Sequence, residues 1–169
     1  MSTPRRRRPL QAVALSLVVI FTLFLSGLLS PRPTPRYAVT DLGVLPGDTE
    51  SSATAINSRD VAVDSSQGAS KGACLFVDGR VMSLGTLPGG SESGARALNS
   101  AGDVAGVAIL PTGDHAFVYS GGKMQDLNDL ISKGADWILE EAHSINDRGQ
   151  IVGKGLHGGR ERGFLLTPR

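Results

Sequence analysis

The amino-acid sequence predicts an all-β fold built from three four-stranded repeats of about 42–47 residues, preceded by an N-terminal hydrophobic helix. Three observations support this fold class: a hairpin motif occurs three times, the chain holds 22 glycines, and aromatic residues make up only 5% of it. Many glycines and few aromatic residues favour short strands and tight turns over helices. Residues 37–169 are numerous enough to bury a core without disulfide or metal staples.

The hairpin motif is clearest at 145–153, Ile-Asn-Asp-Arg-Gly-Gln-Ile-Val-Gly. Asn146 can open a type I turn by bonding its side chain to the backbone two residues on, and Gly149 can take the positive φ that closes the turn with a bulge. Weaker copies lie at 98–106 and 56–64, the latter with Asp60 and Asp64 in place of glycines. Because aspartate tolerates left-handed backbone better than most residues, we expect the first turn to form as well.

Several separate motifs share the same repeat period. The leucines Leu42, Leu84 and Leu127 are 42 and 43 residues apart, and the asparagines Asn57, Asn99 and Asn146 are 42 and 47 apart. A common period across separate motifs indicates a repeat architecture. The predicted repeats span about 37–80, 81–122 and 123–169.

Each repeat is expected to hold four strands. In the first repeat these are 38–41, 53–56, 61–64 and 73–77. The pairs Asp78-Gly79 and Gly121-Gly122 are two-residue hairpin signals that lead into the next repeat. In the third repeat the Leu-Pro-Gly turn is replaced by 128–134, which predicts one helical turn with Asn128 as its cap and Gly134 as its stop.

The repeats resemble the HAF repeat family of probable extracellular bacterial proteins. The family is named for a His-Ala-Phe triplet, which occurs here as His115-Ala116-Phe117. The resemblance covers nearly all of 37–169, including the opening Tyr-x-Val-Thr-Asp-Leu-Gly and the ending Phe-Leu-Leu-Thr-Pro. In the first and third repeats the triplet is Gly72-Ala73-Cys74 and Arg162-Gly163-Phe164. The family implies an extracellular location and a repeated β-architecture, and it carries no activity over to this chain.

How three repeats close is left open by the sequence. Their length matches the blades of β-propellers, which usually have four or more blades. A β-trefoil-like closure is the alternative. Three blade-like units would leave an unpaired interface, so the chain is either a shortened member of its family or assembles with copies of itself.

The N-terminus predicts export. Four arginines at 5–8 precede an uncharged run from Leu10 to Leu29, and a Pro/Arg-rich linker follows at 31–36. A basic flank before an apolar run indicates a signal peptide, although a run of about 20 residues also suffices for a membrane anchor. Residues 1–30 are therefore either a cleaved signal peptide or a retained transmembrane helix. Either alternative places 37–169 outside the cytoplasm, secreted or tethered.

The charge balance excludes some partners. Residues 37–169 carry 11 basic and 16 acidic side chains, a net charge of −5, which attracts neither nucleic acid nor an anionic membrane surface. Membrane contact is expected only through the N-terminal segment. The single cysteine, Cys74, excludes a disulfide framework and a cysteine-based zinc site, and we interpret it as a small buried side chain.

Motifs for chemistry are weak. Residues 68–72 match the G-x-S-x-G pattern around Ser70, but that motif needs a strand-to-helix turn that is not expected here. The histidines His115, His143 and His157 lack metal-like spacing, and the glycines of 87–94 lack the Lys-Ser/Thr pair of a phosphate loop. We therefore predict no catalytic, cofactor-binding or metal residue and no cofactor.

The acidic residues do not show the pattern of a calcium site. Calcium binding needs an alternating ladder of oxygen ligands, which is absent around the aspartates Asp41, Asp64, Asp103, Asp114 and Asp147. Glu140 and Glu141 beside Trp137 are compatible with a sugar subsite, but a tryptophan in such a place more often covers a core edge.

We therefore expect an exported, extracytoplasmic, non-enzymatic repeat module that is structural or binds a protein or glycan at the cell surface. The alternative is a secreted hydrolase that acts on carbohydrate through carboxylates such as Asp114, Glu140 and Glu141. A facing pair of carboxyl groups about 5–10 Å apart would favour the hydrolase.

Overall fold

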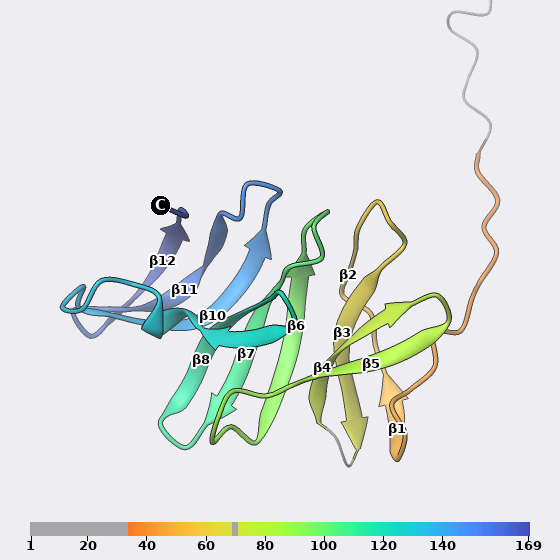
Figure 1. Cartoon of the computed structure of the whole chain (residues 1–169), viewed down its shortest axis with the longest axis horizontal. Helices are drawn as coiled ribbons and strands as arrows, with labels where there is room; N and C mark the ends of the chain where they lie inside the picture. The colour runs from red at the N-terminus through yellow and green to blue at the C-terminus, as the bar shows by residue number, and fades with distance from the viewer. Residues whose placement is uncertain (1–33, 69–70) are drawn as a thin grey trace, which may run out of the picture. The chain divides into compact units, whose positions relative to one another are not determined.

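The structure is a computed structural model that describes residues 34–68 and 71–169. Twelve β-strands and one short 3-10 helix make up its regular secondary structure (Figure 1), which confirms the all-β prediction. All strands lie within one compact unit, 41–169. Residues 34–45 contain no strand or helix. The predicted N-terminal helix, whether signal or anchor, lies outside the described residues.

The strands form three antiparallel sheets in chain order. The first sheet consists of β1 (Asp48–Ser51), β2 (Ala55–Ile56), β3 (Ala62–Gly68), β4 (Gly72–Val77) and β5 (Arg80–Gly85). The second consists of β6 (Glu92–Leu98), β7 (Val104–Leu110), β8 (Gly113–Ser120) and β9 (Lys123–Asp126), and the third of β10 (Trp137–Ile145), β11 (Ile151–His157) and β12 (Arg160–Leu166).

The three sheets share one plan. Each is an antiparallel meander in which, apart from β1, every strand pairs with the next strand of its sheet. Two-residue turns join β4 to β5, β7 to β8, β8 to β9 and β11 to β12, whereas the longer asparagine turns join β2 to β3, β6 to β7 and β10 to β11. In the first sheet β1 and β2 both pair with β3, so they are two short pieces of one interrupted inner strand. In the second sheet the inner strand β6 is continuous.

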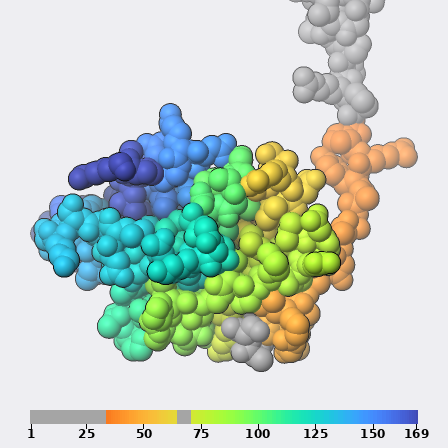
Figure 2. All heavy atoms as spheres, viewed as in Figure 1, coloured from red at the N-terminus to blue at the C-terminus, as the bar shows by residue number. Residues whose placement is uncertain are grey.

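Two hydrophobic cores hold the sheets face to face. Figure 1 shows the sheets side by side, and Figure 2 shows their atoms packed against one another on this side of the molecule. The core between the first and second sheets contains Val63, Ala73, Leu84, Val104 and Phe117 among others. The core between the second and third contains Ala105, Ala116, Leu139, Ile151 and Phe164 among others. Since side chains alternate along a strand, neighbours such as Val104 and Ala105 serve different cores.

The boundaries of the sheets differ from those of the sequence repeats. Residues 82–84 and 124–126, predicted to open the second and third repeats, instead form the outermost strands β5 and β9 of the preceding sheets. The turns at Asp78-Gly79 and Gly121-Gly122 cause this shift, because a tight hairpin keeps its two strands in one sheet. The third sheet consequently has three described strands instead of the four that were predicted.

Two local predictions were wrong. Residues 38–41, predicted as the first strand, form no strand in the structure. The predicted helical turn is a 3-10 helix, η1 (Leu127–Asp129), and its cap is Asp126 in place of Asn128, because the Asp126 carboxylate accepts a hydrogen bond from the Asn128 backbone N–H. Gly134 does adopt a positive φ, +87°, just after this segment.

The repeated hairpin turns form as predicted. The side-chain oxygens of Asn57 and Asn146 accept hydrogen bonds from the backbone N–H two residues on, at 2.9 and 3.0 Å. The closing residues Asp60, Gly102 and Gly149 have φ of +58°, +94° and +70°. Aspartate therefore takes the left-handed position in the first turn.

The described sheets form an open stack. Strand pairing within 34–68 and 71–169 links no sheet to another, so no closed β-trefoil-like barrel is present there. The exposed side chains Ile56 and Leu165 on the two end sheets also show that the described sheets do not close into a propeller ring. That part of the chain also contains no helix long and apolar enough to cross a membrane.

Candidate functional site

The three asparagine turns project from one side of the stack, where the chain passes from β2 to β3, from β6 to β7 and from β10 to β11 (Figure 1). We call residues 57–60, 99–102 and 146–149 the turn row. Each turn is closed by a backbone hydrogen bond from its fourth residue to its asparagine carbonyl, 2.9–3.3 Å long.

Side-chain hydrogen bonds join each turn to the next. The Asn57 amide donates to the Asn99 backbone carbonyl at 3.0 Å, and the Asn99 amide donates to the Asn146 carbonyl at 3.4 Å. Asn99, in the middle, is buried. Asn57 and Asn99 therefore shape their own turns with the side-chain oxygen and hold the following turn with the side-chain nitrogen. The Asn146 side-chain nitrogen instead donates to the Gln150 side chain of its own hairpin.

A second link joins the outer rims of two turns. The Asp147 carboxylate accepts hydrogen bonds from the Ser100 backbone N–H at 2.8 Å and from the Ser100 hydroxyl at 3.1 Å. These two bonds hold the pKa of Asp147 below its usual value. The turn row thus has a fixed backbone, and it presents the exposed side chains of Arg59 and Arg148.

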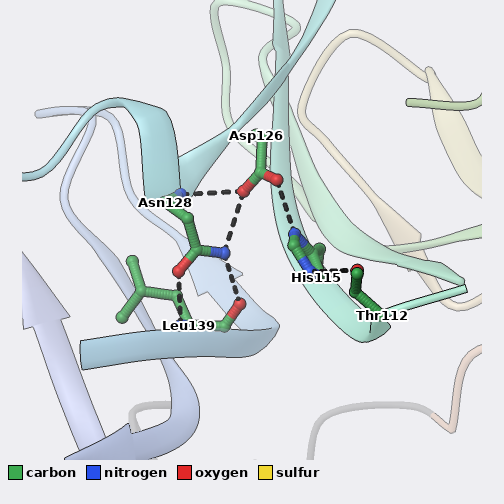
Figure 3. Close-up of polar contacts among 5 residues, drawn as sticks. All are labelled: Thr112, His115, Asp126, Asn128 and Leu139. Carbon is green, nitrogen blue, oxygen red and sulfur yellow. Dashed lines mark hydrogen bonds and ion pairs between the residues drawn. The ribbon is translucent and has the colours of Figure 1, made fainter. Parts of the chain in front are cut away.

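A separate polar cluster, the histidine row, lies on the second sheet and reaches the third (Figure 3). The His115 ring is 3.1 Å from the Thr112 hydroxyl through Nε2 and 2.6 Å from the Asp126 carboxylate through Nδ1. Asp126 also accepts from the Asn128 side chain at 2.9 Å. The Asn128 side-chain oxygen accepts a hydrogen bond from the Leu139 backbone N–H in β10 at 2.7 Å, and its side-chain nitrogen donates to the Leu139 carbonyl at 3.0 Å.

The order hydroxyl, imidazole, carboxylate in the histidine row is the order of a nucleophilic triad. However, the Asp126 carboxylate also caps η1, and through Asn128 it fixes the backbone of β10. These contacts make the row a clamp between the second and third sheets. Sequence reasoning missed the cluster because Thr112, His115 and Asp126 come from a turn and two strands, and only the hairpin pairing of β8 with β9 brings them together.

The other two histidines lie in different surroundings. His143 is exposed, with its ring 3.4 Å from the Glu141 carboxylate. His157 stacks on Trp137 with ring centroids 4.7 Å apart. Within 34–68 and 71–169 no group of three His, Cys, Asp or Glu side chains is arranged to hold a metal ion.

The carboxylates of the hydrolase alternative are distributed over two sheets. Asp114 lies exposed near the start of β8, whereas Glu140 and Glu141 lie in β10. Glu141 bonds the Arg96 guanidinium at 2.9 Å. Burial raises the pKa of Glu141, but the hydrogen bond and charge of Arg96, together with those of His143, outweigh it and leave the pKa below its usual value. Glu141 is thus held as a carboxylate, unlike a general acid, whose pKa must be raised.

Trp137 covers a core edge. It packs against the core between the second and third sheets, and the Phe164 ring meets it edge to face at 6.4 Å. Beside it lies a hollow of about 210 Å³ between β12 and the segment that follows η1. The hollow is lined by Ile131, Ala135, Trp137, Leu139, Gly163, Phe164, Leu165 and Leu166.

Cys74 lacks the setting of a reactive thiol. Cys74 is fully buried, and its burial, with the nearby Asp64 charge, raises the pKa of the thiol to about 11. A thiol with such a pKa is almost entirely protonated at neutral pH and therefore a poor nucleophile. Ser70 lies outside the described residues.

Comparison with protein-family models, with curated proteins and with solved structures found no match to this chain.

Proposed function

We propose that this chain is an exported, extracytoplasmic, non-enzymatic repeat module with propeller-type blades that binds a protein or glycan at the cell surface. The arginines and uncharged run of the N-terminus support export. The face-to-face stack of antiparallel meanders supports propeller-type blades, because propellers repeat such sheets about an axis. The resemblance to the HAF repeat family supports both the repeat architecture and the location.

The turn row is the observation that carries the binding proposal. Its turns are linked laterally by Asn57, Asn99 and Asp147, so the exposed arginines Arg59 and Arg148 are mounted on a fixed backbone. Binding is strengthened when the contacting groups are ordered before the ligand arrives. Guanidinium groups also suit carboxylate and phosphate groups, which they bind with two parallel hydrogen bonds.

The test is a glycan array together with an assay of binding to purified cell-envelope material. We expect the double variant Arg59→Ala/Arg148→Ala to lose at least tenfold in affinity for the glycan or envelope fraction that the parent binds. The matched control is Lys123→Ala/Arg160→Ala, which removes two exposed positive charges from the first residues of β9 and β12, away from the turn row. Equal losses in both variants would show a general charge effect and remove the turn row from the proposal.

A second candidate function, hydrolysis at the Thr112 hydroxyl, is favoured by one observation, the geometry of the histidine row. In such a reaction His115 would take the hydroxyl proton while Asp126 orients the ring. Turnover of activated esters that His115→Gln abolishes, without a change in melting temperature, would support hydrolysis over the non-enzymatic proposal. If His115→Gln lowers the melting temperature and the parent turns over no activated ester, the histidine row is a clamp alone.

A further inference from the structure

Within the part of the chain that the structure describes, the third sheet lacks the outer strand that the other two possess. β5 pairs with the outer edge of β4, and β9 with that of β8. β12 is the counterpart of β4 and β8, and among the described residues it pairs with β11 alone. The backbone groups along the other edge of β12 are thus available for a further strand.

The place of the missing strand is marked by a hollow. Four of the residues that line the hollow beside Trp137, 163–166, are consecutive residues of β12. On the second sheet, β9 lies against the equivalent residues of β8. The residues that line the hollow are apolar, so its polar surface comes mainly from backbone groups, as expected beside a strand edge that another strand can cover.

A segment with the matching sequence lies outside every sheet. Residues 38–41 align with 80–83 of β5 and 123–126 of β9 through the repeated leucines Leu42, Leu84 and Leu127. Val39 is 98% exposed. The two counterparts of this segment are strands, so its sequence suits a strand that has no partner here.

The end of this segment already has the backbone turn that ends its counterparts. The Asp41 carboxylate accepts a hydrogen bond from the Gly43 N–H at 2.9 Å. The equivalent bonds join Ser83 to the Gly85 N–H at 3.1 Å and Asp126 to the Asn128 N–H at 2.8 Å. The turn that ends a fourth strand is therefore formed before any pairing.

We propose that residues 38–41 of one copy of this chain pair with β12 of a second copy as the fourth strand of its third sheet. The register follows from β8 and β9, where Phe117 faces Asp126 and Val118 faces Gln125. By repeat equivalence Asp41 faces Phe164 and Thr40 faces Leu165 of the second copy.

Charge complementarity supports this register. On the second sheet the Asp126 carboxylate pairs with His115. Arg162 stands at the His115 position of the third repeat, and Asp41 stands at the Asp126 position. The proposed pairing therefore brings the exposed Arg162 of one copy to the Asp41 carboxylate of the other.

The two ends of the stack indicate a second copy as the partner. Ile56, on the first sheet, is 68% exposed, whereas its counterparts Leu98 and Ile145 are 8% and 7% exposed because a preceding sheet covers them. At the other end Val152 and Leu165 are exposed, although their counterparts Ala105 and Val118 pack against a following sheet. Each end of the stack thus exposes apolar side chains that the opposite end of a second copy would cover.

The number of sheets agrees with this partner. Three sheets closing on themselves would make a propeller smaller than the usual range of about four to eight blades, whereas three sheets from each of two copies make six. A two-fold dimer with two such contacts is a closed assembly, which leaves no free edge. The turn row would continue through it, with Asn146 of one copy beside Asn57 of the next.

Cysteine cross-linking of the full chain in detergent tests the pairing. Thr40→Cys and Leu165→Cys are made in separate chains, which are then mixed and oxidised. These two positions are chosen because facing residues of antiparallel strands lie within disulfide distance. The buried Cys74 leaves the parent as a background control. The register control is Glu161→Cys, four residues along β12 from Leu165 and about 13 Å away at 3.3 Å per residue.

We expect a covalent dimer from Thr40→Cys mixed with Leu165→Cys, and at least tenfold less from Thr40→Cys mixed with Glu161→Cys. Equal yields from both mixtures would overturn the proposed register. No dimer, while both thiols still react with a maleimide, would overturn the pairing. In one chain carrying both cysteines, a disulfide that forms only within that chain would overturn the second copy as partner.

Charge reversal provides an independent readout. Asp41→Arg and Arg162→Asp should each shift the parent mass, measured by light scattering with detergent subtracted, from dimer toward monomer. The double variant should recover the dimer, because it restores opposite charges across the contact. A monomeric parent, or single variants that remain as dimeric as the parent, would overturn the charge pairing.

Discussion

The first and second sheets differ in the two residues that face each other at equivalent positions of their paired middle strands. In the second sheet Gly106 faces Phe117, and the inner strand β6 runs without interruption. In the first sheet Asp64 faces Cys74, and the inner strand is broken between β1 and β2. The third sheet follows the second, with Gly153 facing Phe164.

The difference teaches what the repeated glycine does. A Cβ atom on Gly106 would overlap the Gly94 carbonyl oxygen of β6 and lie 2.9 Å from the Phe117 ring. Glycine thus allows the inner strand and a large ring to approach the same backbone. In the first sheet Asp64 carries a side chain, which accepts a hydrogen bond from Ser52 in the break between β1 and β2. Compared with the second sheet, the first therefore has a larger residue at 64, where the second has Gly106, and a smaller one at 74, where the second has Phe117.

The largest effect is expected from removing the ring that the glycine accommodates. Phe117 is fully buried between the first and second sheets, so Phe117→Ala should lower the free energy of unfolding by about 3–5 kcal/mol. Thermal and urea unfolding followed by circular dichroism would measure the change. The exposed Leu130→Ala is the control, and an equal loss in both variants would contradict the central role of Phe117.

Adding one methyl group at the glycine should be nearly as damaging. Gly106→Ala forces β6 or the Phe117 ring to move, and we expect a loss of about 2–3 kcal/mol, in the range of overpacked cores. Gly94→Ala is the matched control, because its Cβ would meet no atom closer than 3.9 Å. If the two variants unfold at the same denaturant concentration, the close approach is not what selects glycine.

Converting the first sheet to the pattern of the second tests whether the two positions are coupled. Cys74→Phe alone should cost about 1–3 kcal/mol, because the ring enters a filled core next to the Asp64 side chain. Adding Asp64→Gly should recover part of that loss. A double-mutant cycle measures the coupling, and strictly additive effects would refute it.

The smallest effect concerns a charge pair between the second and third sheets. Because Arg96 helps keep the pKa of Glu141 below its usual value, the pair stabilises the fold above the unfolded-state pKa of about 4.3, and that stability is lost as pH falls through the lower folded pKa. The partly exposed pair should contribute less than about 1 kcal/mol. The free energy of unfolding of Arg96→Gln would be compared with that of the parent from pH 7 to pH 3. The difference between the two proteins should shrink as the pH falls toward 3. A constant difference would exclude Glu141 as its source.

Local features were predictable wherever neighbouring residues determine them. The asparagine turns and the left-handed Asp60 follow from side-chain bonding and backbone sterics within a few residues. The histidine row was not predictable, since Thr112, His115 and Asp126 meet only through strand pairing. The lateral bonds of the turn row also depend on the stacking of the sheets, which no single repeat contains.

The sequence by itself determined the all-β class, the number of repeats and the positions of their turns, because periodicity and turn chemistry are properties of short segments. Tertiary structure alone decided that 38–41 form no strand and that the asparagine turns bond to one another across the stack. A strand exists only where a partner offers its backbone groups, and the partner of a strand lies in space rather than in the neighbouring residues.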